Sequence, residues 1–291
     1  MNAAGMCKTL EPQSIADISR PFDAVVVGSI TPLQRSGNTG ACEELESSLY
    51  GLNSWGMPNA GVRSAQYVDG LHGPLANSLT PVIVSVAGFS VEDYYLLVRK
   101  LACWGAGIEL NLGCPNVRDG GSQHKIASFD PIYMANILDK IKLLHAVKDL
   151  TTIGVKLSPY SDPGLLKEIA AVITESGLVH YVATCNTFPN GIGFDSQGRS
   201  RIQTDQAGWF GGISGTALNP ISLSNAYQFR QQLPETIAVV RVGGISSARD
   251  VWESYHIGCA GVQIGTAYAQ KGPQLINTIR EDLASLHEEL S

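Results

Sequence analysis

Short apolar runs alternate with longer segments of helical periodicity along most of the 291-residue chain. The runs are rich in β-branched residues and are continuously apolar rather than alternating, a pattern typical of strands in a parallel sheet that helices cover. We expect strands at residues 24–27, 82–86, 108–112, 152–157, 181–184, 238–242 and 261–264.

The segments between these runs carry apolar residues at the spacing of amphipathic helices. Asp130 and Asp162 each precede a proline, and Ser90 precedes an amphipathic segment, so all three residues indicate helix N-termini. We expect helices at residues 12–20, 63–71, 91–104, 131–147, 163–176, 222–232, 248–256 and 274–290.

This regular alternation of strand and helix predicts an α/β fold, specifically a (β/α)8 TIM barrel. The alternative is an open, doubly wound sheet, but no G-x-G-x-x-G sequence follows an early strand. The apolar runs supply seven full strands, so the first barrel strand is expected to be truncated near Asn2. Because no linker, repeat or low-complexity tract is visible, residues 1–291 are expected to form one domain.

Two connections, residues 28–61 and 186–220, are much longer than the two to six residues that are usual between strand and helix. Both follow the C-terminal ends of expected strands. A TIM barrel builds its active site at that end, so both connections are expected to contribute to the site.

Composition narrows the range of partners. The chain has 20 Lys+Arg and 26 Asp+Glu, a net charge of −6, and no basic clusters, which argues against nucleic acid or an anionic membrane as partner. No apolar run is long enough to span a bilayer and no secretory signal is visible, so we expect a cytoplasmic protein. The six cysteines form no C-x-x-C pair, so neither a disulfide scaffold nor a metal site is expected.

Residues 109–116 (ELNLGCPN) are the strongest candidate for chemistry. Asn111 and Asn116 offer the donors and acceptors that match the alternating C=O and N–H edge of a cyclic amide. Cys114 between them is a candidate proton acceptor if its environment favours the thiolate. A buried structural cysteine beside turn-forming asparagines is the alternative, and the flanking carboxamides favour the functional interpretation.

Two further polar clusters are residues 53–59 (NSWGMPN), within the first long connection, and residues 184–187 (TCNT), at the end of the strand before the second. Either cluster alone is compatible with ordinary turns. Together with residues 109–116, they could converge on one small polar ligand at one face of the barrel.

Three glycine-containing segments have the features of a phosphate site: residues 210–215 (FGGISG), 242–246 (VGGIS) and 264–267 (IGTA). Barrels often bind phosphate with backbone N–H groups of the loops after their last two strands. Each segment alone could be a tight turn, but the set favours a phosphate site. Lys156 ends an apolar strand, where it either pairs structurally or faces an electron-rich cofactor; we favour the cofactor.

Together these segments resemble dihydroorotate dehydrogenases of the soluble, fumarate-linked class, which are FMN-containing (β/α)8 barrels. The resemblance covers nearly the whole chain, and ELNLxCPN is its most specific part. It implies dihydroorotate oxidation with Cys114 as catalytic base, a soluble electron acceptor such as fumarate, and a homodimer. It implies substrate contacts from Asn53, Trp55, Gly56, Met57, Asn111, Asn116, Asn186 and Thr187. It implies FMN contacts from Ala4, Gly5, Gly28, Ser29, Asn111, Lys156, Gly212, Gly243, Gly244, Gly265 and Thr266.

The sequence departs from the family pattern at two positions near the substrate. Gly28 stands where the family has a lysine, and Trp55 stands where it has a methionine. These departures favour a second hypothesis, the same flavin chemistry on another cyclic amide, imide or lactone in specialised metabolism. A third hypothesis is a barrel that binds FMN or a phosphorylated ligand without catalysis.

Overall fold

A parallel sheet of seven strands in chain order forms the centre of the described part of the molecule. The structure is a computed structural model that describes residues 1–6, 12–45, 49–64, 78–102, 106–114, 118–119, 122–123, 125–145 and 152–290. The strands are β1 (Val25–Ile30), β5 (Val82–Val86), β6 (Gly107–Asn111), β9 (Thr152–Leu157), β10 (Tyr181–Thr184), β14 (Ala238–Val242) and β15 (Gly261–Gln263). Because the strand order never reverses, the sheet is that of a barrel, as expected, and not a doubly wound sheet.

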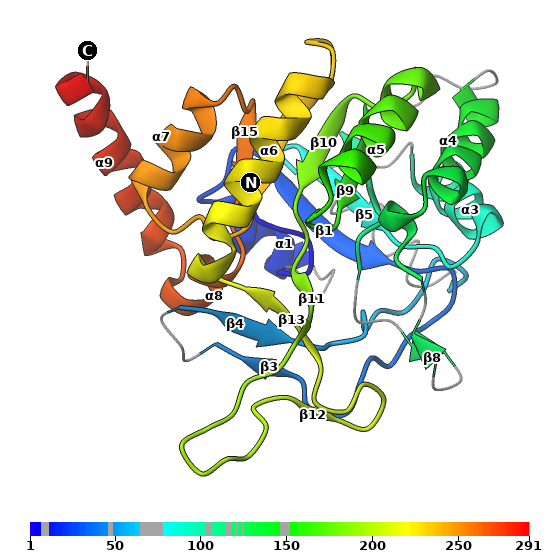
Figure 1. Ribbon diagram of the computed structural model, residues 1–291, viewed down its shortest axis with the longest axis horizontal. Coiled ribbons are helices and arrows are strands. Elements are labelled where there is room, and N and C mark those ends of the chain that lie inside the picture. Colours follow the sequence, from blue (N-terminus) through cyan, green and yellow to red (C-terminus); the bar gives the residue numbers. More distant parts are fainter. Residues whose placement is uncertain are drawn as a thin grey trace.

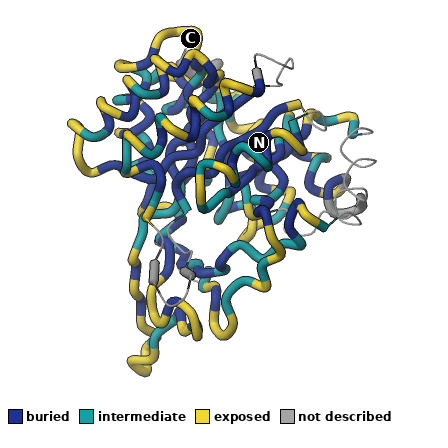
Figure 2. The backbone as a smooth tube through the Cα atoms, turned by 90° about the vertical axis from the view of Figure 1, so that its right-hand side faces the viewer, coloured by how far each residue is buried: buried dark blue, intermediate teal, exposed yellow. Residues whose placement is uncertain are grey.

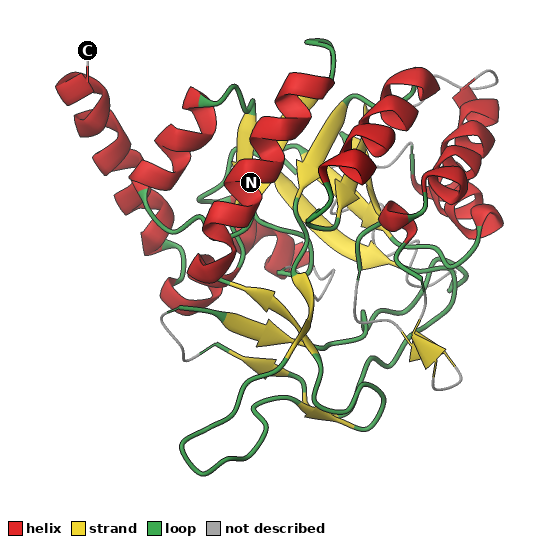
Figure 3. Ribbon diagram, in the orientation of Figure 1, coloured by secondary structure: helices red, strands yellow, loops and turns green. Residues whose placement is uncertain are grey.

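The helices lie on the outside of this sheet, as Figures 1 and 3 show. In Figure 2 the buried backbone runs through the middle of the molecule, while exposed segments lie on its outside. The helices are α1 (Pro12–Ser19), α3 (Val91–Leu101), α4 (Pro131–His145), α5 (Pro163–Ser176), α6 (Asn219–Gln232), α7 (Ala248–His256), α8 (Thr266–Lys271) and α9 (Gln274–Leu290).

Most expected boundaries agree with this structure, and the differences have local causes. The strand expected at 24–27 extends to Ile30, which still pairs with Val86 after an irregularity. Helix α6 begins at Asn219 rather than at 222, because Pro220 fits the first helical turn. Helix α8 was not expected, and most of the expected helix 63–71 lies outside the described residues.

The expected helix caps are confirmed. Ser90 Oγ accepts a hydrogen bond from Asp93 N at 3.1 Å, and Asp162 Oδ1 accepts one from Gly164 N at 2.8 Å. Asp130 Oδ1 accepts one from Tyr133 N at 2.9 Å. Each bond satisfies a backbone donor that has no partner within its own helix.

Residues 1–3 take the place of the truncated first strand and close the barrel. On one side Ala3 N donates to Ile264 O at 2.9 Å, and Ile264 N donates to Met1 O at 3.0 Å. On the other side the contact is made by a side chain: Asn2 Oδ1 accepts from Val26 N at 2.9 Å, and Asn2 Nδ2 donates to Val26 O at 2.7 Å. The fully buried amide of Asn2 thus substitutes for a ladder of strand hydrogen bonds.

Replacing Asn2 by leucine is expected to lower the free energy of unfolding by about 2–4 kcal/mol. The substitution keeps an apolar side chain of similar size but leaves the N–H and C=O of Val26 buried without partners. Urea denaturation measures the effect, with Asn136→Leu on the exposed face of α4 as the matched control. Equal effects of the two substitutions would show that Asn2 does not hold the closure.

The two long connections build a second, antiparallel sheet, which was not predicted. Its order is β11 (Phe188–Gly191), β13 (Gly211–Ser214), β4 (Gly51–Asn53) and β3 (Glu43–Glu44), and β12 (Gln203–Thr204) pairs separately with β2 (Gly40–Ala41). The loop after β6 carries a further pair, β7 (Arg118–Asp119) and β8 (Ser122–Gln123). In Figure 1 the antiparallel sheet lies beyond one end of the barrel, below the strands in that view. It therefore covers the barrel end to which the long connections lead.

Candidate active site

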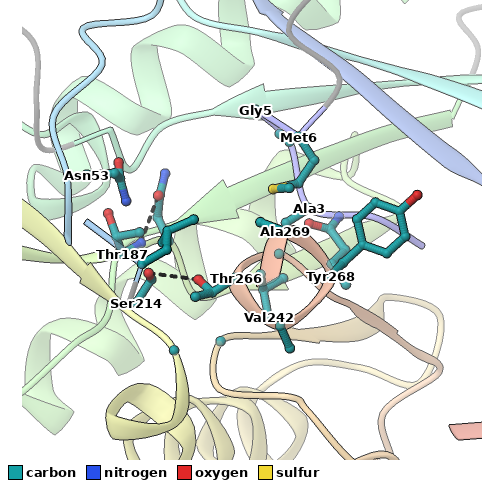
Figure 4. A pocket seen from close by; sticks show the side chains of 18 of the residues that line it. Ala3, Gly5, Met6, Asn53, Thr187, Ser214, Val242, Thr266, Tyr268 and Ala269 are labelled. Carbon is teal, nitrogen blue, oxygen red and sulfur yellow. Dashed lines mark hydrogen bonds between the residues drawn. The ribbon is translucent and has the colours of Figure 1, made fainter. Parts of the chain in front are cut away.

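A cavity of about 1350 Å³ lies between the C-terminal ends of the barrel strands and the antiparallel sheet. Figure 4 shows Asn53 and Thr187 on one side of it and Ala3, Gly5 and Met6 on the other. The expected site residues that line it are Ala4, Gly5, Gly28, Ser29, Asn53, Trp55, Gly56, Met57, Asn111, Cys114, Lys156, Asn186, Thr187, Gly243, Gly244, Gly265 and Thr266. The three polar clusters of the sequence therefore meet in one place.

Two expected residues are not among those lining the cavity. Gly212 lies in β13 beside it, where its carbonyl oxygen accepts from Asn53 Nδ2 at 3.4 Å. Asn116 lies outside the described residues.

A chain of hydrogen bonds orients the carboxamides of the cavity. Asn111, at the end of β6, donates from Nδ2 to Ser29 Oγ at 2.9 Å and accepts at Oδ1 from Asn186 Nδ2 at 3.1 Å. Asn186 Oδ1 in turn accepts from the backbone N of Thr187 at 2.8 Å. These bonds link β1, β6 and the segment after β10, so the polar wall is positioned before a ligand binds.

Cys114 lies three residues beyond the end of β6, half-buried at the cavity wall. The backbone that leads to it is held from two sides: Tyr94 Oη donates to Asn111 O at 2.9 Å, and Ser158 Oγ donates to Gly113 O at 3.1 Å. A thiol on a fixed, partly exposed segment can approach a bound ligand, as a proton acceptor must.

Lys156 brings a positive charge to the inner wall of the cavity at the end of β9. Its side chain is 4% exposed and makes no hydrogen bond or ion pair within the described residues. Burial lowers the pKa of Lys156, while Glu109 and the thiols of Cys185 and Cys114 oppose that change. An unpaired buried ammonium group beside a cavity is suited to an electron-rich ligand.

The glycines that are expected to hold a phosphate, the phosphate cradle, follow the end of β14. Gly244 has a φ of +75°, and a Cβ there would collide with the backbone of Asn219. The loop is held from behind, because Ser222 Oγ donates to Gly243 O at 2.6 Å and Asn219 Nδ2 donates to Gly244 O at 3.3 Å. Thr266 donates to Ser214 Oγ at 2.8 Å on the facing side, as Figure 4 shows.

Arg241 is a residue of this region that the sequence analysis missed. It is fully buried behind the cradle and donates to Asn219 O at 3.2 Å, Ser222 Oγ at 3.0 Å and Ser254 Oγ at 3.1 Å. Burial lowers its pKa, and the nearby Asp250 carboxylate opposes that change. The sequence feature that could have pointed to Arg241 is the presence of a charged residue inside the apolar run 238–242. The guanidinium ties α6 and α7 to β14 and so supports the glycine loop.

The residues present fit a bound FMN. The cavity exceeds the 300–1,000 Å³ that is usual for one small-molecule ligand, so a cofactor and a substrate can share it. Gly243, Gly244, Gly265 and Thr266 would hold the phosphate, where backbone can approach an anion closely. Lys156 would face the flavin ring from the barrel.

The fold and this cavity define a flavin-binding barrel oxidoreductase. The family model "Dihydroorotate dehydrogenase" matches residues 1–286. The "Dihydroorotate dehydrogenase (fumarate)" of Trypanosoma cruzi is 31% identical, with 98% of this chain and 88% of that protein covered. The protein of the same description from Saccharomyces cerevisiae is 30% identical, and the match covers 99% of this chain and 89% of that protein.

The chain therefore belongs to the dihydroorotate dehydrogenase family, whose members are FMN-dependent oxidoreductases acting on CH–CH bonds. A crystal structure of an Eimeria tenella dihydroorotate dehydrogenase in complex with ferulenol has the same fold, with a TM-score of 0.78. It is 19% identical in sequence, and the match covers 99% of this chain and 81% of that one. No helix in the described ranges is long and apolar enough to cross a bilayer.

Proposed function

We propose that this protein is an FMN-dependent enzyme that oxidises dihydroorotate to orotate and passes the electrons to a soluble acceptor such as fumarate. This reaction belongs to pyrimidine biosynthesis. The observation that carries the proposal is the convergence of Cys114, Asn53, Asn111 and Asn186 on one cavity with a glycine-lined phosphate cradle. Membership in the family, with fumarate-linked relatives aligned over nearly the whole chain, supports it.

The side chains divide the work of this reaction. The carboxamides of Asn53, Asn111 and Asn186 bind the C=O and N–H groups of the pyrimidine ring and hold it against the flavin. Cys114 takes the proton from C5 of the substrate. FMN, when bound, supplies the hydride acceptor N5 for the hydrogen on C6. Lys156 stabilises the negative charge that two-electron reduction brings to the flavin ring.

Anaerobic reduction tests the proposal. The purified protein is expected to be yellow, to lose its flavin absorbance when dihydroorotate is added without oxygen, and to regain it with fumarate. Orotate formation is followed by its ultraviolet absorbance. A colourless protein would contradict flavin binding, and a yellow protein that no candidate donor bleaches would favour a barrel that binds FMN without catalysis.

A second candidate function is supported by Gly28, at the position of the family lysine. Its φ is +100°, and a Cβ there would lie 2.6 Å from Ser85 O, so this backbone leaves no room for a side chain. Nearby, Trp55 Nε1 donates to Glu43 Oε1 at 3.0 Å at the edge of the cavity. This end of the cavity suits a cyclic amide, imide or lactone without a carboxylate.

Steady-state kinetics separate the two candidates. The comparison is dihydroorotate against 5,6-dihydrouracil, which has the same ring but no carboxylate, and against a panel of unsaturated cyclic amides and lactones. A higher kcat/KM for dihydroorotate supports the first candidate. A higher kcat/KM for an uncharged compound supports the second.

We further propose that residues 1–291 form one domain and that the protein works as a cytoplasmic homodimer. The exposed apolar side chains of Ile192, Phe194, Trp209 and Phe210 gather around β11 and β13, and the rings of Phe194 and Trp209 pack edge to face with centroids 6.0 Å apart. Such a patch is a suitable contact surface for a second copy. Light scattering that gives the mass of one chain would contradict the dimer.

A further inference from the structure

A carboxylate with no assigned role lies inside the barrel beneath the cavity. Glu109 of β6 is fully buried; its Oε2 accepts from Gln263 Nε2 at 2.6 Å and from Tyr181 Oη at 3.2 Å. Among the described residues its other oxygen, Oε1, has no hydrogen-bond partner, and neither has Oε1 of Gln263. Buried acceptors without partners are costly, so this cluster calls for a positive charge or a donor nearby.

The barrel is built to give this carboxylate its partners. Glu109, Gly154 and Tyr181 are register neighbours on three adjacent strands, β6, β9 and β10. A Cβ at Gly154 would collide with the ring of Tyr181, so only glycine lets that ring cross β9 and reach Glu109. Such close packing around an interior charge indicates that the position of the charge matters.

Lys156 is the cation that this carboxylate faces. It lies on β9 two residues beyond Gly154, on the same inward face as Glu109, which puts the two Cα atoms about 8 Å apart. Glu109 is also the first of the groups that favour the charged form of Lys156 against burial. In the barrel interior, where the effective dielectric constant is well below that of water, the charge of one group changes the proton affinity of the other.

We propose that Glu109 is a positioning residue of the active site, whose carboxylate keeps Lys156 protonated and directed at the flavin from inside the barrel. The proposal rests on the flavin-binding part of the proposed function. In the described residues the other titratable groups facing Lys156 are the thiols of Cys114 and Cys185. Burial raises the pKa of Cys185 to about 12, so this thiol stays neutral at ordinary pH.

The test is the flavin midpoint potential of the FMN-loaded Glu109→Gln variant and of the wild type, measured without substrate at a series of pH values. Where Lys156 is protonated in both proteins, loss of the negative charge favours reduced flavin about tenfold, a rise of about 30 mV for two electrons. With rising pH the variant is expected to lose the proton of Lys156 before the wild type does, because the carboxylate that favours the charged lysine is gone. Between these two deprotonations the variant has the lower potential, by a similar amount.

This reversal of sign with rising pH distinguishes the proposal from a structural role. In the Lys156→Met background the Glu109→Gln change is expected to raise the potential equally at every pH, because no lysine is left to titrate. A shift of one sign across the whole pH series in the single variant would overturn the proposal.

If the Glu109→Gln variant does not retain FMN, a comparison of FMN loading between two other variants tests the proposal instead. Glu109→Gln/Lys156→Met removes both charges and is expected to bind FMN at least as well as Lys156→Met alone, because it lacks the buried carboxylate that Lys156→Met leaves without its cation. Poorer loading of the double variant than of Lys156→Met would overturn the proposal. A wild-type protein without flavin would refute the proposed function itself, whereas a loaded wild type without the reversal in the variant would refute only the role of Glu109.

Discussion

Replacing Cys114 by alanine is expected to leave FMN bound and to slow substrate-driven flavin reduction about 10²-fold or more. In the proposed mechanism the thiol is the proton acceptor and the glycine loops hold the phosphate, so the substitution is expected to slow the chemistry without weakening cofactor binding. Anaerobic stopped-flow absorbance at the flavin band measures the reduction rate, and the flavin-to-protein ratio measures loading. Unchanged reduction kinetics would refute the assignment of Cys114 as the base.

Two other thiols serve as controls for this prediction. Cys185 also lines the cavity, but burial raises its pKa to about 12, so it carries no thiolate at neutral pH. Cys259 is buried away from the cavity. Cys185→Ala and Cys259→Ala are both expected to retain reduction rates within a few-fold of the wild type. A large loss in Cys185→Ala with none in Cys114→Ala would move the base to the other thiol.

Gly244→Ala is expected to weaken FMN binding about tenfold or more. A left-handed backbone costs a non-glycine residue roughly 1–2 kcal/mol, and about 1.4 kcal/mol corresponds to a factor of ten in affinity. The added Cβ would also collide with the backbone of Asn219, whose side chain holds the same loop. To accommodate the added Cβ, the loop at Gly244 has to shift at the position where the phosphate is expected to bind. Quenching of FMN fluorescence on titration of the apoprotein measures the dissociation constant.

Gly272→Ala is the matched control for this substitution. Gly272 has nearly the same φ, +70°, but a Cβ there meets nothing within 4 Å, and the residue does not line the cavity. It should cost stability through the strain of a positive φ at a non-glycine residue and leave FMN affinity unchanged. Equal FMN affinities for Gly244→Ala and Gly272→Ala would show that the loop at Gly244 is not part of the phosphate cradle.

The parallel barrel could be predicted because each of its strands has a recognisable pattern in its own short stretch of sequence. Runs such as Val82–Val86 and Ala238–Val242 are apolar throughout, and burial on both faces of a parallel sheet requires that pattern. The antiparallel sheet could not be predicted in this way. Strand β4 has three residues and β3 has two, and Gly211 and Gly212 carry no side chain to reveal alternation. Their pairing depends on partners far away in the chain.

The residues of the candidate site also fall into those that the sequence could predict and those that it could not. Cys114, Asn111 and the loop at Gly243 could be found because each belongs to a short segment whose residue types are informative by themselves. The sequence shows Arg241 and Glu109 as charges within apolar strands, but what each one does could not be predicted, because the groups that they contact lie elsewhere in the chain. Glu109 is 72 residues from Tyr181 and 154 residues from Gln263.

The sequence by itself determined the barrel, the segments that line its site and the glycines that are expected to hold a phosphate, since strand periodicity, residue chemistry and backbone freedom are local properties. Only the tertiary structure decided how the barrel closes, through the side chain of Asn2 between β15 and β1. It also decided that Gly28 has no room for a side chain and that the carboxylate of Glu109 is buried on the strand next to that of Lys156. These features arise from distances between residues far apart in the chain, which folding alone establishes.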